Sequence, residues 1–163
     1  MEKIEGFAYI MGSDINTDDI VPSHALTLRD PSEMAQCACE TIDPKFSEKA
    51  NKLNIIIACE NFGCGSSREE AVNVLKILGI KTIIAKSFAR IYFRNLINKG
   101  IPAITLNWNN DDFSEGDHLE IHLDKGFLNN LTKSKTMKFE KLPEFLLDIV
   151  KQGGVINKLK NNT

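Results

Sequence analysis

The chain has 163 residues, of which 42% are apolar and 26% are charged, with a net charge of −2 and a pI of about 5.9. These values are typical of a folded globular protein and exclude a collagen-like, disordered or strongly basic nucleic-acid-binding chain. There is no apolar run of the roughly 18 residues that span a bilayer and no signal-peptide pattern, so we expect one cytoplasmic domain over residues 1–163, with no nucleic-acid or membrane partner.

The first third of the chain predicts a short strand, a polar turn and a short helix. Residues 6–12 form an apolar run between glycines, typical of a strand. The run 13–19 is polar, which predicts a turn. It is not an EF-hand calcium loop, because it lacks the glycine and terminal glutamate of that motif. Its Asp14, Asn16 and Asp19 are expected to hydrogen-bond their own backbone. Asp30 is expected to cap a short helix that begins at Pro31.

The middle of the chain alternates strands with helices. Apolar, β-branched runs predict buried strands at 54–58, 82–85 and 103–106. Amphipathic periodicity predicts helices at 69–78 and 87–99, which end at Gly79 and Gly100. This order implies a parallel sheet with right-handed crossovers.

The last third of the chain predicts antiparallel strands and a final helix. Alternating side chains over 118–123 indicate an exposed antiparallel strand, and Met137 with Phe139 indicates another. A final helix is expected over 143–152, ended by two glycines. The predicted class is therefore α/β, with a parallel βαβαβ core and flanking antiparallel strands.

The four cysteines, Cys37, Cys39, Cys59 and Cys64, match neither a zinc pattern nor a four-cysteine iron–sulfur pattern. We expect free thiols and no metal or cofactor bound to this chain.

The segment 60–70 carries the strongest chemical signal. Gly63 and Gly65 allow close approach of a ligand to the backbone. Ser66 and Ser67 are good N-caps, with a predicted capping box from Ser67 to Glu70 and free helix amides nearby that attract anions. Arg68 adds a guanidinium that can grip a carboxylate. The segment predicts a site for a small carboxylate, although capping alone would explain the serines.

Several separated motifs resemble the swivel domain of the aconitase superfamily. They are Phe-Gly-Cys-Gly-Ser-Ser-Arg-Glu at 62–69, Ala-Lys-Ser-Phe-Ala-Arg-Ile at 85–91, Asn95, Gly-Ile-Pro at 100–102, and the N-terminal run 12–22. The resemblance covers most of residues 6–106 and is loose from residue 107. The short chain looks like the free-standing small subunits of 3-isopropylmalate dehydratases rather than a domain of one long aconitase chain.

The resemblance implies a swivelling β/β/α domain and a hydro-lyase of the EC 4.2.1 type. Such an enzyme interconverts 2- and 3-isopropylmalate by dehydration and rehydration in leucine biosynthesis. The resemblance also implies a large partner subunit that carries a [4Fe–4S] cluster, a small dicarboxylate hydroxy-acid substrate, and self-association of the small subunit when it is alone.

By resemblance, Ser66 is the base that removes a proton from the carbon next to a carboxylate. Its alkoxide requires amides and a cation, which the turn and Arg68 could supply. Arg68, Ser67 and Thr17 are expected to bind substrate, and Asp18 is expected to orient or balance an arginine. Arg90 and Arg94, one helical turn apart, are expected on a solvated or interface face.

By resemblance, substrate choice depends on a loop after the N-terminal motif, here Ala25, Leu26, Thr27, Leu28 and Arg29. Homoaconitase-like relatives have an arginine where an ungapped comparison places Thr27. An apolar pocket formed by Ala25, Leu26 and Leu28 favours an alkyl group over a further carboxylate. Arg29 could restore a carboxylate contact if the loop shifts. The alternatives are a homoaconitase, a citraconate/methylmalate or dimethylmalate dehydratase small subunit, and a non-catalytic carboxylate-binding module.

Overall fold

The structure is a computed structural model that describes residues 3–162. One mixed, seven-stranded sheet runs through it in the order β4-β3-β2-β1-β5-β6-β7. The strands are β1 (Ile4–Ile10), β2 (Ile55–Ala58), β3 (Thr82–Ala85), β4 (Ala103–Thr105), β5 (His118–His122), β6 (Phe127–Asn130) and β7 (Lys135–Lys138). The expected α/β class, with a parallel core and antiparallel flanking strands, is confirmed.

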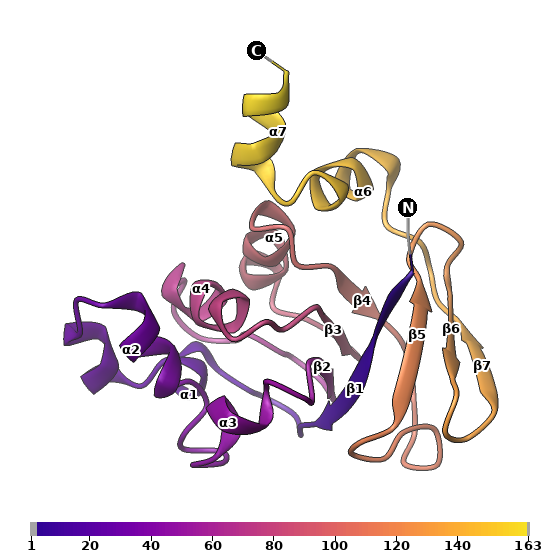
Figure 1. Ribbon diagram of the computed structural model, residues 1–163, viewed down its shortest axis with the longest axis horizontal. Coiled ribbons are helices and arrows are strands. Elements are labelled where there is room, and N and C mark those ends of the chain that lie inside the picture. Colours follow the sequence, from indigo (N-terminus) through magenta and orange to yellow (C-terminus); the bar gives the residue numbers. More distant parts are fainter. Residues whose placement is uncertain (1–2, 163) are drawn as a thin grey trace.

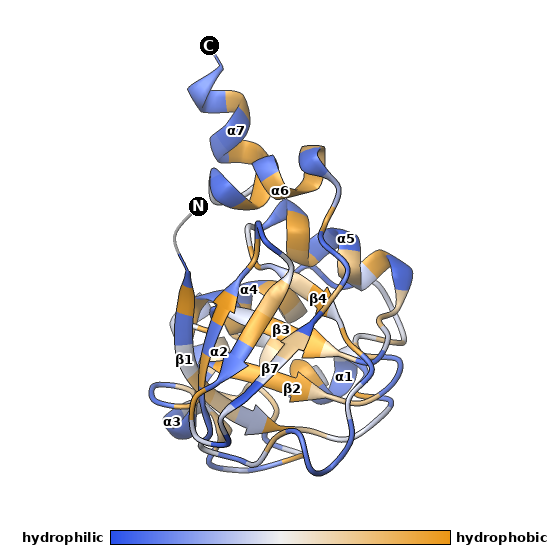
Figure 2. Cartoon of the chain, turned by 90° about the vertical axis from the view of Figure 1, so that its right-hand side faces the viewer, coloured by the Kyte–Doolittle hydropathy of each residue, from blue (hydrophilic) through white to orange (hydrophobic). Residues whose placement is uncertain are grey.

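The parallel half of the sheet is the buried half. Strands β1 to β4 pair in parallel, with Ile57 opposite Ile10 on one side and Ile84 on the other. Every residue of β2 and β3 is buried, which explains their unbroken apolar sequences. Figure 2 shows these strands as a hydrophobic centre.

The antiparallel half begins where β5 pairs with β1. Gly6 lies opposite Leu119 in this pair, and β6 and β7 continue the meander. Leu119 and Ile121 are buried, while Glu120 between them and the flanking His118 and His122 are half-buried, so the alternation has one core face, as predicted. Residues 127–130 also form a strand, which the sequence pattern did not reveal.

Seven α-helices and one 3-10 helix are present in the described part of the chain. They are α1 (Thr17–Ile20), η1 (Ser23–Thr27), α2 (Pro31–Gln36), α3 (Phe46–Lys49), α4 (Glu70–Ile77), α5 (Arg90–Asn98), α6 (Glu144–Lys151) and α7 (Val155–Asn161). Figure 1 shows α1 to α4 on the left of β1 and the antiparallel strands on its right. Asp30 caps α2 as predicted, its side chain accepting a hydrogen bond from the amide of Ser32.

The helix predicted from residue 87 begins three residues later, at Arg90. The backbone of residues 87–89 is engaged in pairing with the loop after β2 instead. The amide of Phe62 donates to the Ser87 carbonyl at 3.1 Å, and the Ala89 amide donates to the Phe62 carbonyl at 2.9 Å. Tertiary pairing therefore overrides the local helical pattern.

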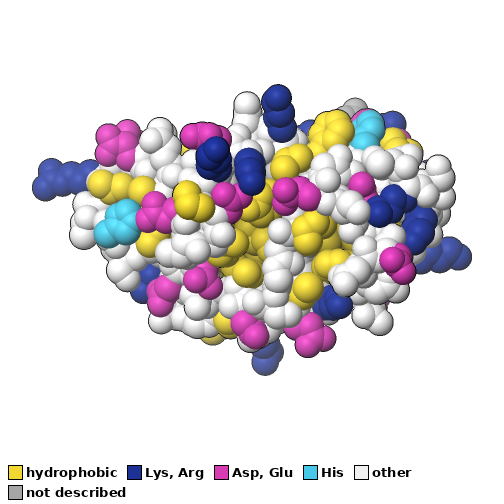
Figure 3. All heavy atoms as spheres, turned by 90° about the horizontal axis from the view of Figure 1, so that it is seen from below, with side chains coloured by type: hydrophobic (Ala, Val, Ile, Leu, Met, Phe, Trp, Pro, Cys, Tyr) yellow, Lys and Arg dark blue, Asp and Glu magenta, His cyan; other side chains and the backbone are white. Residues whose placement is uncertain are grey.

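The surface is mixed in charge. Figure 3 shows acidic and basic side chains interspersed around apolar ones on one face, in keeping with the small net charge. Among the described helices, none is long and apolar enough to cross a bilayer.

Candidate active site

Three loops meet at the carboxyl edge of the parallel strands β1, β2 and β3. Two isolated parallel bridges join them, one between Asn16 and Cys64 and one between Phe62 and Phe88. Because parallel strands bring their carboxyl ends to one edge, segments far apart in sequence come together here. This loop cluster contains or borders the site residues that were predicted from the motif at 62–69 and from the N-terminal run 12–22.

Thr17 fixes the turn that carries the two serines. Its backbone amide donates to the Cys64 carbonyl at 2.9 Å, and its hydroxyl donates to the Ser66 carbonyl at 2.8 Å. Thr17 is buried, whereas Ser66 and Ser67 are exposed. The serine hydroxyls thus lie on an accessible surface while their backbone is held from below.

Ser66 and Ser67 line a cavity of about 290 Å³. Its opposite wall is the N-terminus of α5, formed by Arg90, Ile91 and Tyr92. The first turn of a helix has backbone amides without intrahelical acceptors and carries a partial positive charge. The residues that line the cavity therefore include two serines, the first turn of a helix and an arginine, a combination that suits an anion.

The predicted capping box from Ser67 to Glu70 is wrong. Helix α4 begins at Glu70, with Glu69 as its N-cap and no side-chain cap. The amide of Ala71 bonds to the Arg68 carbonyl at 3.2 Å and that of Val72 to the Glu69 carbonyl at 3.0 Å, so a backbone turn starts the helix. The first turn of α5 lines the Ser66 cavity, whereas no residue of α4 does.

Arg68 and Asp18 form an ion pair beside this cavity. Nη1 of Arg68 lies 2.7 Å from Oδ1 of Asp18 and donates to the Val21 carbonyl at 3.3 Å. The Arg68 side chain is 22% exposed and that of Asp18 is 63% exposed. The structure thus brings together the two residues that the sequence assigned to carboxylate binding and arginine orientation. Their roles toward a substrate stay predictions.

Gly63 is required by close packing under the site. Its φ is +85°, and a Cβ atom there would lie 2.2 Å from the Tyr92 ring. The Tyr92 hydroxyl donates to the Ala71 carbonyl at 2.8 Å, so this ring ties α5 to α4. Tertiary packing therefore explains the glycine.

The expectation that polar residues of the run 13–19 bond their own backbone is met at two positions and not at a third. Asn16 and Asp19 form a reciprocal capping box at α1, as expected for residues that bond their own backbone. Asp14 does not follow this expectation, because its carboxylate accepts from the Asn61 side chain at 3.1 Å. Asp14 therefore joins two loops instead of closing its own turn.

The expected specificity loop does not form an open apolar pocket in this chain. Ala25 is completely buried in the core, and its amide donates to the carbonyl of Pro22, the N-cap of η1. Leu26 and Leu28 are half-buried and pack against the core, and only Thr27 and Arg29 are exposed. None of residues 25–29 lines the Ser66 cavity, and their role in substrate choice stays a prediction.

The cysteines do not converge on a cluster site. All four are free thiols, and Cys39 is buried in the core. Burial, with Asp14 nearby, raises the pKa of the Cys64 thiol, which disfavours the reactive thiolate. Within residues 3–162, the one grouping of potential metal ligands contains a single cysteine. The arrangement does not fit a four-iron cluster held by this chain.

The sequence placed Arg90 on a solvated or interface face, and Arg90 is exposed; Asn95 had no role of its own beyond the resemblance. The structure places both on the wall of the Ser66 cavity. The signal that could have found them is positional: residues 86–89 follow a buried parallel strand next to the one that precedes Ser66.

Comparison with known proteins gives a consistent result. Residues 10–110 match the aconitase C-terminal domain family. The chain is 41% identical to 3-isopropylmalate dehydratase small subunit 1 of Methanopyrus kandleri, over 98% of this chain and 94% of that protein. It is 43% identical to the isopropylmalate/citramalate isomerase small subunit of Methanocaldococcus jannaschii, over 96% and 94%. The crystal structure of a 3-isopropylmalate dehydratase from M. jannaschii superposes with a TM-score of 0.90, at 44% identity over 98% of this chain and 95% of that one.

Proposed function

Since this chain belongs to the aconitase C-terminal domain family and to its 3-isopropylmalate dehydratase small subunits, we propose that it is the small subunit of a hydro-lyase that acts on an alkyl-substituted malate. The observation that carries the proposal is the convergence of Thr17, Ser66 and Ser67 in one cavity, beside the Arg68–Asp18 pair. The membership makes the enzyme a heteromer of small and large subunits in leucine biosynthesis.

Ser66 is proposed to remove the proton from the carbon next to a substrate carboxylate. A serine hydroxyl is a weak base, so its oxygen needs positive groups near it when the proton has been lost to solvent or a partner group. Arg90 and the rest of the first turn of α5 line the same cavity and are proposed to supply that field. Ser66 then returns a proton when water adds back to the double bond.

Arg68 is proposed to bind a substrate carboxylate, with Ser67 assisting. In this chain the guanidinium is held by Asp18 and by the Val21 carbonyl, which fixes its position. Both contacts are made by Nη1, and the guanidinium has further N–H donors that are proposed to bind the substrate carboxylate. Asp18 is thus a positioning residue for Arg68.

The cluster is proposed to lie on the large subunit, where it supplies a Lewis acid for the substrate hydroxyl. The scattered cysteines of this chain do not fit such a group. The large subunit must therefore reach the Ser66 cavity. Because all four cysteines are free thiols, we propose the reducing cytoplasm as the location.

The docking surface for the large subunit is proposed to include a groove beside the cavity. The groove has a volume of about 790 Å³ and shares Arg90 with the Ser66 cavity. Phe93, Arg94 and Phe145 also line it, and Phe145 is 66% exposed. An apolar surface flanked by two arginines suits a partner segment with apolar and acidic side chains.

The substrate is proposed to carry an alkyl group rather than a third carboxylate. Leu26 and Leu28 are half-buried, and Thr27 occupies an exposed position where homoaconitase-like proteins have arginine. The exposed Arg29 is the one cation within 25–29. A preference for homoisocitrate that Arg29→Gln abolishes would contradict the alkylmalate proposal.

The test is reconstitution with a cluster-loaded large subunit under anaerobic conditions. We expect turnover of 3-isopropylmalate or citramalate. The absorbance of the unsaturated intermediate measures this turnover. Ser66→Ala should reduce kcat by about 10²- to 10⁴-fold, the usual contribution of a general base. Ser32→Ala, an exposed serine in α2, is the matched control and should retain activity. Ligand binding by the lone chain without turnover in a formed complex would favour the binding-module alternative.

A further inference from the structure

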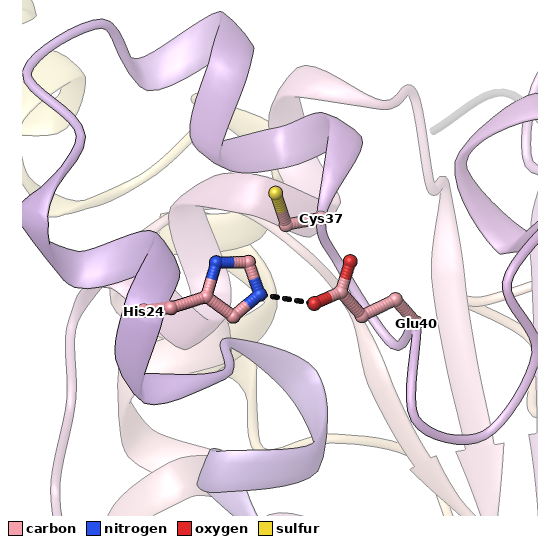
Figure 4. A group of neighbouring side chains, drawn as sticks. All are labelled: His24, Cys37 and Glu40. Atoms are coloured by element: carbon pink, nitrogen blue, oxygen red, sulfur yellow. Dashed lines mark hydrogen bonds and ion pairs between the residues drawn. The ribbon is translucent and has the colours of Figure 1, made fainter.

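A group of three side chains outside the Ser66 cavity has the composition of a metal site. His24 lies in η1, Cys37 follows α2 as its C-cap, and Glu40 lies in the turn beyond it. One ligand atom of each lies within 4.8 Å of the other two. Figure 4 shows the three side chains gathered from two segments, with Nε2 of His24 paired to Oε1 of Glu40.

We propose that His24, Cys37 and Glu40 bind a zinc ion. An imidazole nitrogen, a thiolate and a carboxylate are the three ligand types that Zn²⁺ accepts, in a tetrahedron with bonds of about 2.0–2.3 Å. The thiolate disfavours Mg²⁺ and Ca²⁺, which prefer oxygen ligands. On binding, Zn²⁺ separates the His24–Glu40 pair and replaces the Cys37 thiol proton, which passes to the buffer.

The backbones that carry these side chains are fixed by buried neighbours. On one side, Ala25 is fully buried, next to His24, and its amide donates to the Pro22 carbonyl at 2.9 Å. On the other, Cys39 is fully buried between Cys37 and Glu40, and its amide donates to the Ile20 carbonyl at 3.0 Å. Side-chain rotation alone can therefore bring the ligands to an ion, without a cost for ordering the chain.

The site is open on one side. The His24 side chain is 62% exposed and that of Glu40 is 35% exposed. Three protein ligands leave the fourth position of a tetrahedral ion to water. A bound ion would also connect η1 to the turn after α2 and so restrain residues 25–29, the segment that the proposed function assigns to substrate choice.

The other two histidines provide matched controls. His118 pairs with Glu5 at 2.8 Å and His122 with Glu120 at 2.8 Å. Each combines an imidazole with a carboxylate, but neither belongs to a group of three ligands within the described residues. If a histidine–carboxylate pair alone captured zinc, these pairs would bind it as well.

The test is titration of the full chain with Zn²⁺ by calorimetry, and with Co²⁺ by absorbance, in the presence of a phosphine reductant. We expect one ion per chain and a sulfur-to-cobalt charge-transfer band. Cys37→Ser should abolish the band, and Cys37→Ser or His24→Gln should weaken zinc binding by at least about tenfold. Cys59→Ser and His118→Gln should leave both signals unchanged.

A second measurement does not depend on enzymatic activity. Zinc should slow amide hydrogen exchange in residues 25–28 of the wild type and not of Cys37→Ser, because the ion joins the two segments. A stoichiometry near zero, or zinc binding that persists in both Cys37→Ser and His24→Gln, would overturn the proposal. Loss of turnover in the reconstituted complex with this zinc binding intact would count against the proposed function alone.

Discussion

The hydroxyl of Thr17 donates a 2.8 Å hydrogen bond to the backbone carbonyl of Ser66, across 49 positions of sequence. Thr17 is the first residue of α1, which follows β1, and Ser66 lies in the loop after β2; the Thr17 amide bonds to the same turn at Cys64. Thr17 therefore acts on the proposed base through the backbone. This makes its hydroxyl a positioning group whose removal should change catalysis more than folding.

Thr17→Val tests this relationship. The substitution keeps the volume but removes the donor, so we expect a loss of about 1 kcal/mol in the free energy of unfolding. We expect kcat of the reconstituted enzyme to fall at least about tenfold because Ser66 is no longer held in place. Urea unfolding and steady-state kinetics measure the two effects. Thr17→Ser keeps the hydroxyl and should restore most of kcat; equal loss in both variants would assign the effect to packing.

Asp18→Asn should separate orientation of Arg68 from stability. The Asp18 carboxylate is 63% exposed, so we expect the free energy of unfolding to change by less than about 1 kcal/mol. KM should rise about tenfold or more, because an unpaired guanidinium no longer keeps its position for a substrate carboxylate. The control is Asp148→Asn, which removes an exposed ion pair with Lys158 at the far C-terminal end. An unchanged KM in Asp18→Asn would contradict the positioning role.

Gly63→Ala should be strongly destabilising. The new Cβ would lie 2.2 Å from the Tyr92 ring, and the φ of +85° disfavours any side chain. Overpacking and strain together predict a loss of about 2–4 kcal/mol in the free energy of unfolding, measured by urea or thermal melting. Gly12→Ala is the matched control, since a Cβ there meets nothing within 4 Å. Similar losses in both variants would refute the packing argument.

Acid should remove part of the stability through Asp43. Hydrogen bonds from the Lys49 ammonium, the Lys45 amide and the Tyr9 hydroxyl lower its pKa to about 2. Because the folded-state pKa lies below the ordinary value of 3.8, the stabilisation is present above about pH 4 and is lost as pH falls toward about 2.

Asp43→Asn should therefore lower stability at about pH 7 and make it less dependent on pH between about 4 and 2. Tyr9→Phe, which removes one of the donors, should have a smaller effect in the same direction, of about 1 kcal/mol. Urea midpoints measured across this pH range provide the comparison. An unchanged acid dependence in Asp43→Asn would show that other carboxylates dominate it.

The local sequence pattern predicts those elements in which buried positions are apolar and exposed positions are polar. The apolar runs at 55–58 and 82–85 predict buried parallel strands because both faces of those strands are covered. Apolar periodicity likewise predicts helix α4, and the Asp30 cap predicts the start of α2. Short elements such as α1, α3 and β6 were missed, since each mixes polar and apolar residues over four positions and has no unbroken apolar run like those of β2 and β3.

The sequence by itself determined the class of fold, the two motifs and the residue types that suit a carboxylate. Only the tertiary structure decided that the first turn of α5 lines the Ser66 cavity, because residues 87–89 pair with the loop after β2 and so delay the start of α5. It also decided that Ala25 is core and that His24 meets Cys37 and Glu40. The physical reason is the same in each case: these relationships depend on long-range contacts between loops, which have no periodic signature along the chain.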